Sequence, residues 1–133
     1  MLVRLSGMNS SRFSEIEDRI NREAPHLSRS EATALAQIVE RLVRAYEPER
    51  IYLFGSMARG DGGPDSDFDL LLVVPDEAEP ARRRSRLAYE TLRGTGTAAD
   101  ILVVTRTDFD SRLHVLASLA ATVAREGMLL HVA

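Results

Sequence analysis

The chain has 133 residues, 44% of them hydrophobic and 28% charged, and its formal net charge at pH 7 is −3. This length and composition are those of a globular protein with one core. The net negative charge argues against a broad nucleic-acid-binding face, which is normally basic. The absence of cysteine excludes a disulfide scaffold and a cysteine zinc site.

Neither a membrane segment nor a secretion signal is predicted. No apolar run in the sequence approaches the ~18–20 residues of a membrane span, and the N-terminus lacks the apolar core of a signal peptide. Together with the missing cysteines, these features predict a cytoplasmic protein. We expect no membrane contact and no direct nucleic-acid partner.

Residues 1–29 are predicted to be an N-terminal extension, and residues 30–133 the main domain. The extension holds at most one short helix, near residues 12–23, whose apolar face would be Phe13, Ile16 and Ile20. Ser28 and Glu31 then have the spacing of a capping box that opens a second helix. Its apolar residues keep the helical period up to Tyr46, so this helix should cover one face of a sheet.

A β-prone run begins at Ile51 and ends abruptly at Gly55 and Ser56. Glycine at that point permits a sharp turn and the close approach of a ligand. A short helix from Ser56 would direct free N–H groups and the serine hydroxyl toward an anion. The alternative for Ser56 is simple capping of that helix.

Asp67 and Asp69 head a second apolar strand that continues to Val74. Because side chains alternate along a strand, both carboxylates point to the same face. Adjacent carboxylates repel each other, and sheet packing does not require them. A divalent cation would remove the repulsion, and Mg²⁺ takes a few carboxylate oxygens while keeping positions for water and phosphates.

A helix is predicted at about residues 80–93 and a third strand at 99–104. Asp100 begins the third strand and repeats the pattern of Asp67 and Asp69. If the second and third strands are neighbours, the three carboxylates come together and could hold two metal ions. The alternative is that Asp100 only solvates a strand end.

A last helix is predicted to start at a cap on Thr107 or Ser111 and to stop at Gly127. Its apolar face would be Leu113, Leu116, Ala120 and Val123. Residues 128–132 could add a short strand. The predicted fold class is α/β (α+β), with a small mixed sheet flanked by helices.

Two arginine features have more than one interpretation. Arg59 could reach nucleotide phosphates, or it could clamp its own loop through Asp61 or Asp65. The basic cluster at 82–86 could be the solvated face of a helix, or a docking surface for an acidic partner or nucleic acid.

The Gly-Ser pair, ten further residues and then Asp-x-Asp resemble the signature of the DNA polymerase β-type nucleotidyltransferase superfamily. The longer string GSMARGD…DSDFDLLLVV is similar to that of its short members, the minimal nucleotidyltransferases, and the resemblance extends over residues 30–133. Such proteins are often encoded beside a HEPN-domain toxin and act as its antitoxin. The resemblance implies the polymerase β-like nucleotidyltransferase fold.

The resemblance also implies roles for individual residues. The catalytic and metal-binding residues would be Asp67, Asp69 and Asp100. The nucleotide-binding residues would be Gly55, Ser56, Arg59 and Ser66. The expected cofactor is Mg²⁺, in a two-metal site, and the expected substrate is ATP.

The activity implied is transfer of AMP from ATP to a hydroxyl, that of a tyrosine, on a HEPN-type toxin that is thereby silenced. One alternative is a binding-only antitoxin that occludes the toxin, and another is an antibiotic-type small-molecule nucleotidyltransferase. The intact carboxylates favour catalysis, and the lack of a substrate domain disfavours the small-molecule enzyme. The expected partners are the toxin and a nucleotide triphosphate, in a homo-oligomer or a hetero-complex.

Overall fold

The computed structural model describes residues 10–63 and 66–133. Its helical segments are α1 (Ser10–Glu23), α2 (Arg29–Tyr46), α3 (Ser56–Arg59), the 3-10 turn η1 (Pro80–Arg83), α4 (Arg86–Thr91), α5 (Arg106–Ser111) and α6 (Leu119–Glu126). Its strands are β1 (Arg50–Phe54), β2 (Phe68–Val74), β3 (Ala99–Thr105) and β4 (Met128–Val132).

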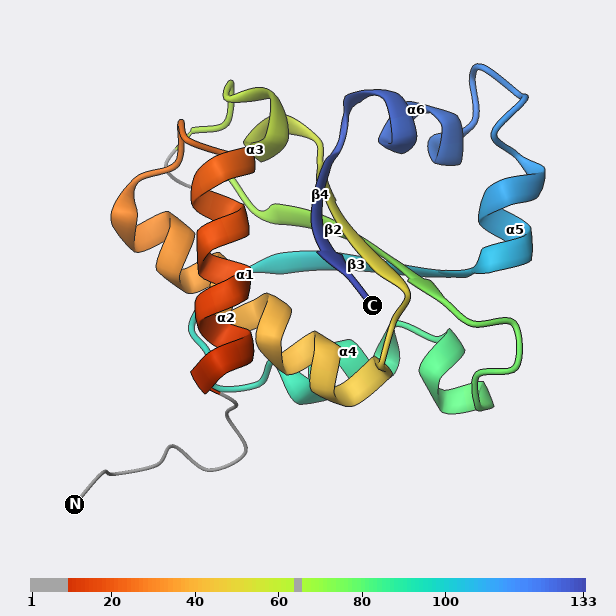
Figure 1. Cartoon of the computed structure of the whole chain (residues 1–133), viewed down its shortest axis with the longest axis horizontal. Coiled ribbons are helices and arrows are strands. Elements are labelled where there is room, and N and C mark those ends of the chain that lie inside the picture. Colours follow the sequence, from red (N-terminus) through yellow and green to blue (C-terminus); the bar gives the residue numbers. More distant parts are fainter. Residues whose placement is uncertain (1–9, 64–65) are drawn as a thin grey trace.

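The four strands form one mixed sheet in the order β3-β2-β1-β4 (Figure 1). β1 pairs antiparallel with both β2 and β4, whereas β2 and β3 are parallel. The predicted fold class is confirmed: helices flank a small mixed sheet, as in the polymerase β-like nucleotidyltransferase fold. None of the helices in the described part of the chain is long and apolar enough to cross a membrane.

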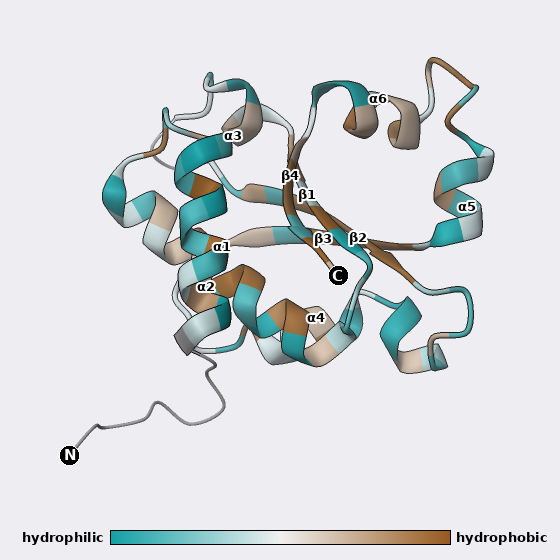
Figure 2. Ribbon diagram, viewed as in Figure 1, coloured by the Kyte–Doolittle hydropathy of each residue, from teal (hydrophilic) through white to brown (hydrophobic). Residues whose placement is uncertain are grey.

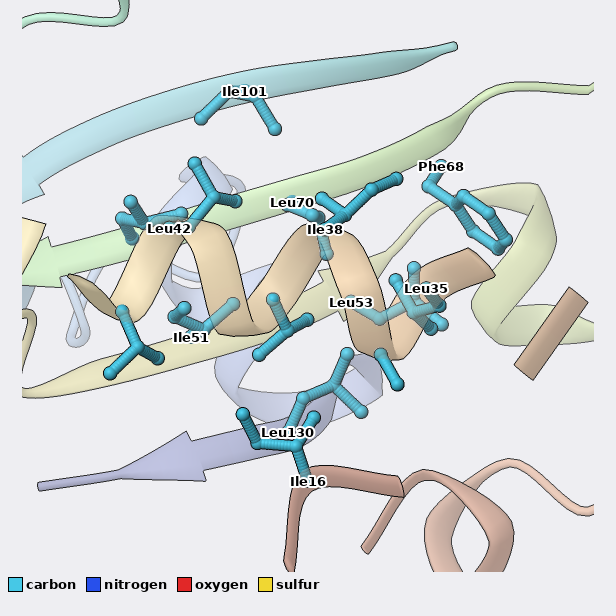
Figure 3. Close-up of a cluster of buried hydrophobic side chains, with 14 of the residues drawn as sticks. Ile16, Leu35, Ile38, Leu42, Ile51, Leu53, Phe68, Leu70, Ile101 and Leu130 are labelled. Carbon is cyan, nitrogen blue, oxygen red and sulfur yellow. The ribbon is translucent and has the colours of Figure 1, made fainter. Parts of the chain in front are cut away.

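Helix α2 covers one face of the sheet, as its periodicity predicts. Its capping box is present, since the Glu31 N–H donates to Ser28 Oγ at 3.1 Å and the Ser28 N–H donates to Glu31 Oε1 at 2.8 Å. Figure 3 shows the apolar stripe of α2 packed against side chains of β1, β2 and β3. Full burial of each such Leu or Ile stabilises the fold by roughly 1.5–3 kcal/mol.

The N-terminal helix α1 contacts α2 and strand β4. Its residues Ile16 and Ile20 are buried in the same cluster as the α2 stripe, and Ile16 lies beside Leu130 in Figure 3. The helix predicted near residues 12–23 is therefore present at Ser10–Glu23. The division of the chain at residue 29 stays a prediction, and residues 1–9 lie outside the described residues.

The opposite face of the sheet is covered in part by α5 and α6. A second buried cluster forms there from Tyr52, Leu71, Val73, Phe109, Ala120 and Val123. The Tyr52 and Phe109 rings stack with centroids 5.6 Å apart, and the guanidinium of Arg50 lies 5.0 Å from the centroid of the Phe109 ring. These contacts anchor the short helix α5 to the sheet. The rest of this face is available for a site.

The single helix predicted at residues 80–93 is wrong, because the segment divides into η1 and α4 with Arg84 in an extended conformation between them. The cause is the hydroxyl of Tyr46. It donates to the Arg84 carbonyl oxygen at 2.5 Å and accepts from the Ala88 N–H at 2.8 Å. Those two groups would otherwise bond each other in a continuous α-helix, so the hydroxyl replaces one helical hydrogen bond.

The single last helix capped at Thr107 or Ser111 is also wrong. Two short helices stand in its place, α5 capped by the Thr105 side chain and α6 capped by the Ser118 side chain. Residues 112–118 form the connection between them, so Leu113 and Leu116 are exposed instead of buried. Serine at position 118 starts a new helix in the middle of an apolar period, which the period alone does not indicate.

Replacing Tyr46 by Phe tests the hydroxyl bridge. The Arg84 carbonyl oxygen would lose its donor, and the Ala88 N–H would keep only its bond to the Ser85 carbonyl oxygen at 2.9 Å. Loss of the two hydrogen bonds of the hydroxyl should lower the free energy of unfolding by about 1–3 kcal/mol in urea titrations. The matched control is Tyr52→Phe, because the Tyr52 hydroxyl accepts only from the Arg50 guanidinium, at 3.1 Å. The Tyr52→Phe variant should lose less than about 0.5 kcal/mol of the free energy of unfolding. Equal losses of stability in the two variants would contradict the hydroxyl bridge.

Candidate active site

The three candidate carboxylates meet where β1 ends and where β2 and β3 begin. Asp69 is paired with Phe54 of β1 on one side and with Asp100 of β3 on the other. Paired residues of neighbouring strands point to the same face. This is the face that carries α5 and α6. The register of the sheet therefore brings Asp100 beside Asp69. Asp67 lies just before the first residue of β2, Phe68, and its charge acts on Asp69.

Asp69 is the partly buried member of the trio, while Asp67 and Asp100 are exposed. The pKa of Asp69 is raised, first by its burial and then by the negative charges of Asp100 and Asp67, with Arg59 acting in the opposite sense. The carboxylates are thus close enough to repel one another through space. A divalent cation at this point would relieve the repulsion, so the donor set fits a hard metal ion.

Within the described residues, no group of three or more His, Asp or Glu side chains is arranged ready to hold a metal ion. Mg²⁺ commonly uses one or two carboxylates and takes its remaining ligands from water and substrate phosphates. The trio supplies a negative, partly buried surface for such an ion. It does not supply a closed protein cage of the kind that Ca²⁺ or structural Zn²⁺ requires.

Gly55 has a backbone conformation that other residues avoid, with φ 75° and ψ −158°. The carboxylate of Asp69 lies directly over its α-carbon, so that a Cβ atom at position 55 would collide with Asp69 Oδ2. Glycine is therefore required twice, for the turn and for the space that Asp69 occupies. The turn and the carboxylate form one structural unit.

Ser56 begins the predicted short helix, α3. The Ala58 and Arg59 N–H groups donate to the Gly55 carbonyl oxygen at 3.1 and 3.0 Å, which leaves the first N–H groups of the turn without a helical acceptor. The half-buried Ser56 lies at the start of this turn. Donation to an anion and capping both stay open for its hydroxyl.

The remaining predicted nucleotide-binding residues contact their own loop. Arg59 Nε lies 3.1 Å from Asp61 Oδ2, and both side chains are exposed, so the clamp through Asp61 is present; Asp65 lies outside the described residues. Ser66 Oγ accepts from the Gly63 N–H at 2.8 Å, and the Ser66 N–H donates back to the Gly63 carbonyl oxygen. Both contacts fix the loop, and neither prevents the side chain from meeting a phosphate.

An open hollow of about 390 Å³ adjoins Asp67. Its walls come from the first turn of α2, from α3, and from the loop before β3, through Ser30, Glu31, Ala34, Met57, Ser66, Asp67, Phe68, Gly96, Thr97 and Ala98. Sequence reasoning missed the contributions of Ser30 and Thr97, which lie far from the motif along the chain. Ser30 comes from the first turn of α2, and Thr97 comes from the loop before β3, which pairs with β2.

His26, to which sequence reasoning gave no role, supports α3. Its Nε2 lies within hydrogen-bonding distance of the Met57 carbonyl oxygen, at 2.7 Å, and its ring lies under Gly60. No spacing in the sequence indicates this contact, because 31 residues separate the two partners. The histidine positions the helix that follows the Gly-Ser turn.

Replacing Gly55 by Ala tests the coupling between turn and carboxylate. It should lower the free energy of unfolding by about 3 kcal/mol or more, since backbone strain and the collision with Asp69 add together. Gly94→Ala is the matched control: Gly94 has φ 86°, but a Cβ atom added there would meet nothing within 4 Å. That change should cost only about 1–2 kcal/mol, and equal costs in urea unfolding would refute the collision.

Replacing Asp69 by Asn tests the repulsion. In metal-free buffer at pH 7 the variant should melt roughly 2–4 °C above the wild type, because a charge that faces two like charges is removed. Addition of Mg²⁺ should raise the melting temperature of the wild type and leave that of the variant unchanged. Asp18→Asn, at an exposed site on α1, is the control; a variant less stable than wild type would exclude the repulsion.

Two solved structures are similar to part of the chain. Among solved structures, a protein assigned as a nucleotidyltransferase from Sulfolobus solfataricus is 25% identical, with 80% of this chain and 85% of that chain covered and a TM-score of 0.45. A chain of a toxin–antitoxin crystallised with AMP-PNP is 24% identical, with 73% of each chain covered and a TM-score of 0.49. No curated protein matches the chain.

Both TM-scores are low, so the assignment rests on the domain family. The family model for the nucleotidyltransferase domain matches residues 35–124, well over half of the chain. The matched region contains the Gly-Ser turn and all three carboxylates. The chain therefore belongs to the nucleotidyltransferase domain family.

Proposed function

We propose that the chain is a Mg²⁺-dependent antitoxin of the minimal nucleotidyltransferase type, which transfers AMP from ATP to a tyrosine hydroxyl of a HEPN-type toxin in the cytoplasm. One observation carries the catalytic part of this proposal. The β2–β3 register aligns Asp69 with Asp100 next to the Gly55 turn, and the charge of Asp67 also acts on Asp69. The identity of the toxin is carried by the sequence resemblance.

The nucleotide side of the site is the Gly-Ser turn with its neighbours. The triphosphate would lie against Gly55 and Ser56, where unused N–H groups and a hydroxyl can donate to phosphate oxygens. Arg59 and Ser66 are near enough along the loop to add a positive charge and a further donor. The hollow beside Asp67 offers room for the rest of the nucleotide.

Asp67, Asp69 and Asp100 would hold the metal, in one or two sites. When bound, Mg²⁺ neutralises phosphate charge and makes a neighbouring hydroxyl easier to deprotonate. Their mutual repulsion, reflected in the raised pKa of Asp69, is the property of the chain itself that favours this occupancy. An arrangement costly without a cation becomes favourable with one.

The acceptor hydroxyl would approach the site at Asp100, whose carboxylate is exposed on an edge strand of the sheet. Asp100 would accept the proton of the acceptor hydroxyl as its oxygen attacks the α-phosphorus of ATP. The new bond joins that oxygen to the α-phosphorus, the bond to the bridging oxygen of the β-phosphate breaks, and pyrophosphate leaves. Positioning and charge neutralisation would supply most of the rate enhancement.

The test uses the full chain with ATP, Mg²⁺ and the product of the adjacent gene. Mass spectrometry should find that product heavier by one or more AMP groups. The Asp67→Asn/Asp69→Asn variant should lose about 100-fold or more of the rate, while the Asp18→Asn control keeps it. If the mass of that product is unchanged and the double variant still suppresses toxicity, the chain neutralises the toxin by occlusion and the proposed catalysis is wrong. Modification of a small antibiotic but of no protein would favour the small-molecule enzyme.

A further inference from the structure

Exposed apolar side chains gather on one part of the surface. Of the seven large apolar side chains that are exposed among the described residues, five lie between residues 102 and 119. They define what we call the α5–α6 surface: Leu102, Leu113, Val115, Leu116 and Leu119. Leu116 is 78% exposed, and Figure 2 shows the hydrophobic colour of the α5–α6 connection. Exposed apolar patches on soluble proteins mark interaction sites.

A hollow lies beside Leu119, one of these side chains. It has a volume of about 320 Å³ and lies between β2, β3, α5 and α6. Its walls are mainly apolar, from Leu71, Val104, Phe109, Leu119 and Ala120, with Asp108, Arg112 and Ser118 also present. A hollow of this size can receive one or two large apolar side chains from a partner, which is how the anchor residues of protein interfaces bind.

The connection that presents these side chains is held in shape by its own hydrogen bonds. The Val115 and Ser118 N–H groups donate to the carbonyl oxygens of Arg112 and Val115, and Ser118 Oγ donates to the Arg112 carbonyl oxygen at 2.8 Å. The same Ser118 oxygen accepts from the first turn of α6. Leu116 is therefore held outward by a tied loop, which lowers the entropy cost of binding through it.

Strand β3 links Leu102 of the α5–α6 surface to Asp100 of the candidate active site. Leu102 follows Asp100 by two positions on the edge strand β3, so both side chains face the same side of the sheet. Leu102 is 42% exposed, and Val104, two positions further, lines the hollow. One edge strand thus leads from the carboxylate that would meet the acceptor hydroxyl into the apolar hollow.

We propose that the α5–α6 surface is the docking site of the acceptor protein, a proposal that rests on the function given above and names the surface that brings the hydroxyl to Asp100. The partner would insert an apolar side chain into the hollow. It would place a carboxylate against Arg112, whose exposed side chain lines the hollow and makes no hydrogen bond or ion pair within the described residues.

The position next to Asp100 decides between an acceptor protein and a second copy of the chain. Whatever covers Leu102 also lies against the carboxylate two residues away. A second copy on this face would close the acceptor side of its own site and bring no substrate to it. A protein that carries the hydroxyl can occupy this face while the reaction proceeds.

The experiment measures binding of the full chain to the product of the adjacent gene by calorimetry, without ATP. The variants are Leu116→Asp and Arg112→Glu, both at exposed positions and therefore expected to fold. Each should weaken binding about tenfold or more, and each should keep the rise in melting temperature caused by Mg²⁺ and ATP. The controls are Val132→Asp, at an exposed apolar residue of β4, and Arg93→Glu, at another exposed arginine; neither should change the affinity.

Each outcome decides the proposal separately from the proposed transfer. If Leu116→Asp and Arg112→Glu lose binding while the two control variants keep it, docking is supported even if the wild type transfers no AMP. Wild-type affinity in both variants overturns docking, even if AMP is transferred, and so does a wild type that does not bind the product at all. A chain that sediments alone as a dimer, and as a monomer with Leu116→Asp, assigns the surface to a second copy and also overturns it.

Discussion

The alignment of Asp69 with Asp100 across the parallel β2–β3 pair is the constraint on which the site depends. Parallel strands begin at the same end of a sheet, so an acid near the start of each brings two carboxylates together. A slip of one residue would turn Asp100 toward α2 and expose Ile101, which is buried in the α2 core. The apolar packing that stabilises the sheet therefore also holds like charges side by side.

Residues far from the three acids in the sequence also make this arrangement possible. Gly55 leaves the space into which Asp69 extends, and His26 supports the backbone of α3 just beyond it. Repulsion at a site held by a rigid scaffold lowers stability without a ligand and favours binding of a cation with one. Such a site exchanges some stability of the free protein for function.

The sequence was sufficient to predict the structure wherever the local residue pattern agrees with the final packing. The capping box at Ser28 and the buried face of α2 follow from spacing alone. The sequence pattern did not predict the structure where a side chain distant along the chain determines the local conformation. The hydroxyl of Tyr46, 38 residues from Arg84, interrupts the helix predicted over that region. No local pattern contains that contact, and the same holds for His26.

The prediction that Leu113 and Leu116 are buried failed for a different reason, since both side chains are exposed. Their spacing is that of a buried helical face, yet Ser118 opens a new helix and the side chains lie on a tied loop outside the core. Unburied apolar side chains contribute nothing to the stability of the free chain and promote association. Local pattern and final fold usually agree in natural proteins, and positions where they disagree are enriched in function. Leu113 and Leu116 follow the C-terminal end of β3, the edge strand that carries Asp100 near its start, so the disagreement marks the α5–α6 connection as a candidate interaction surface.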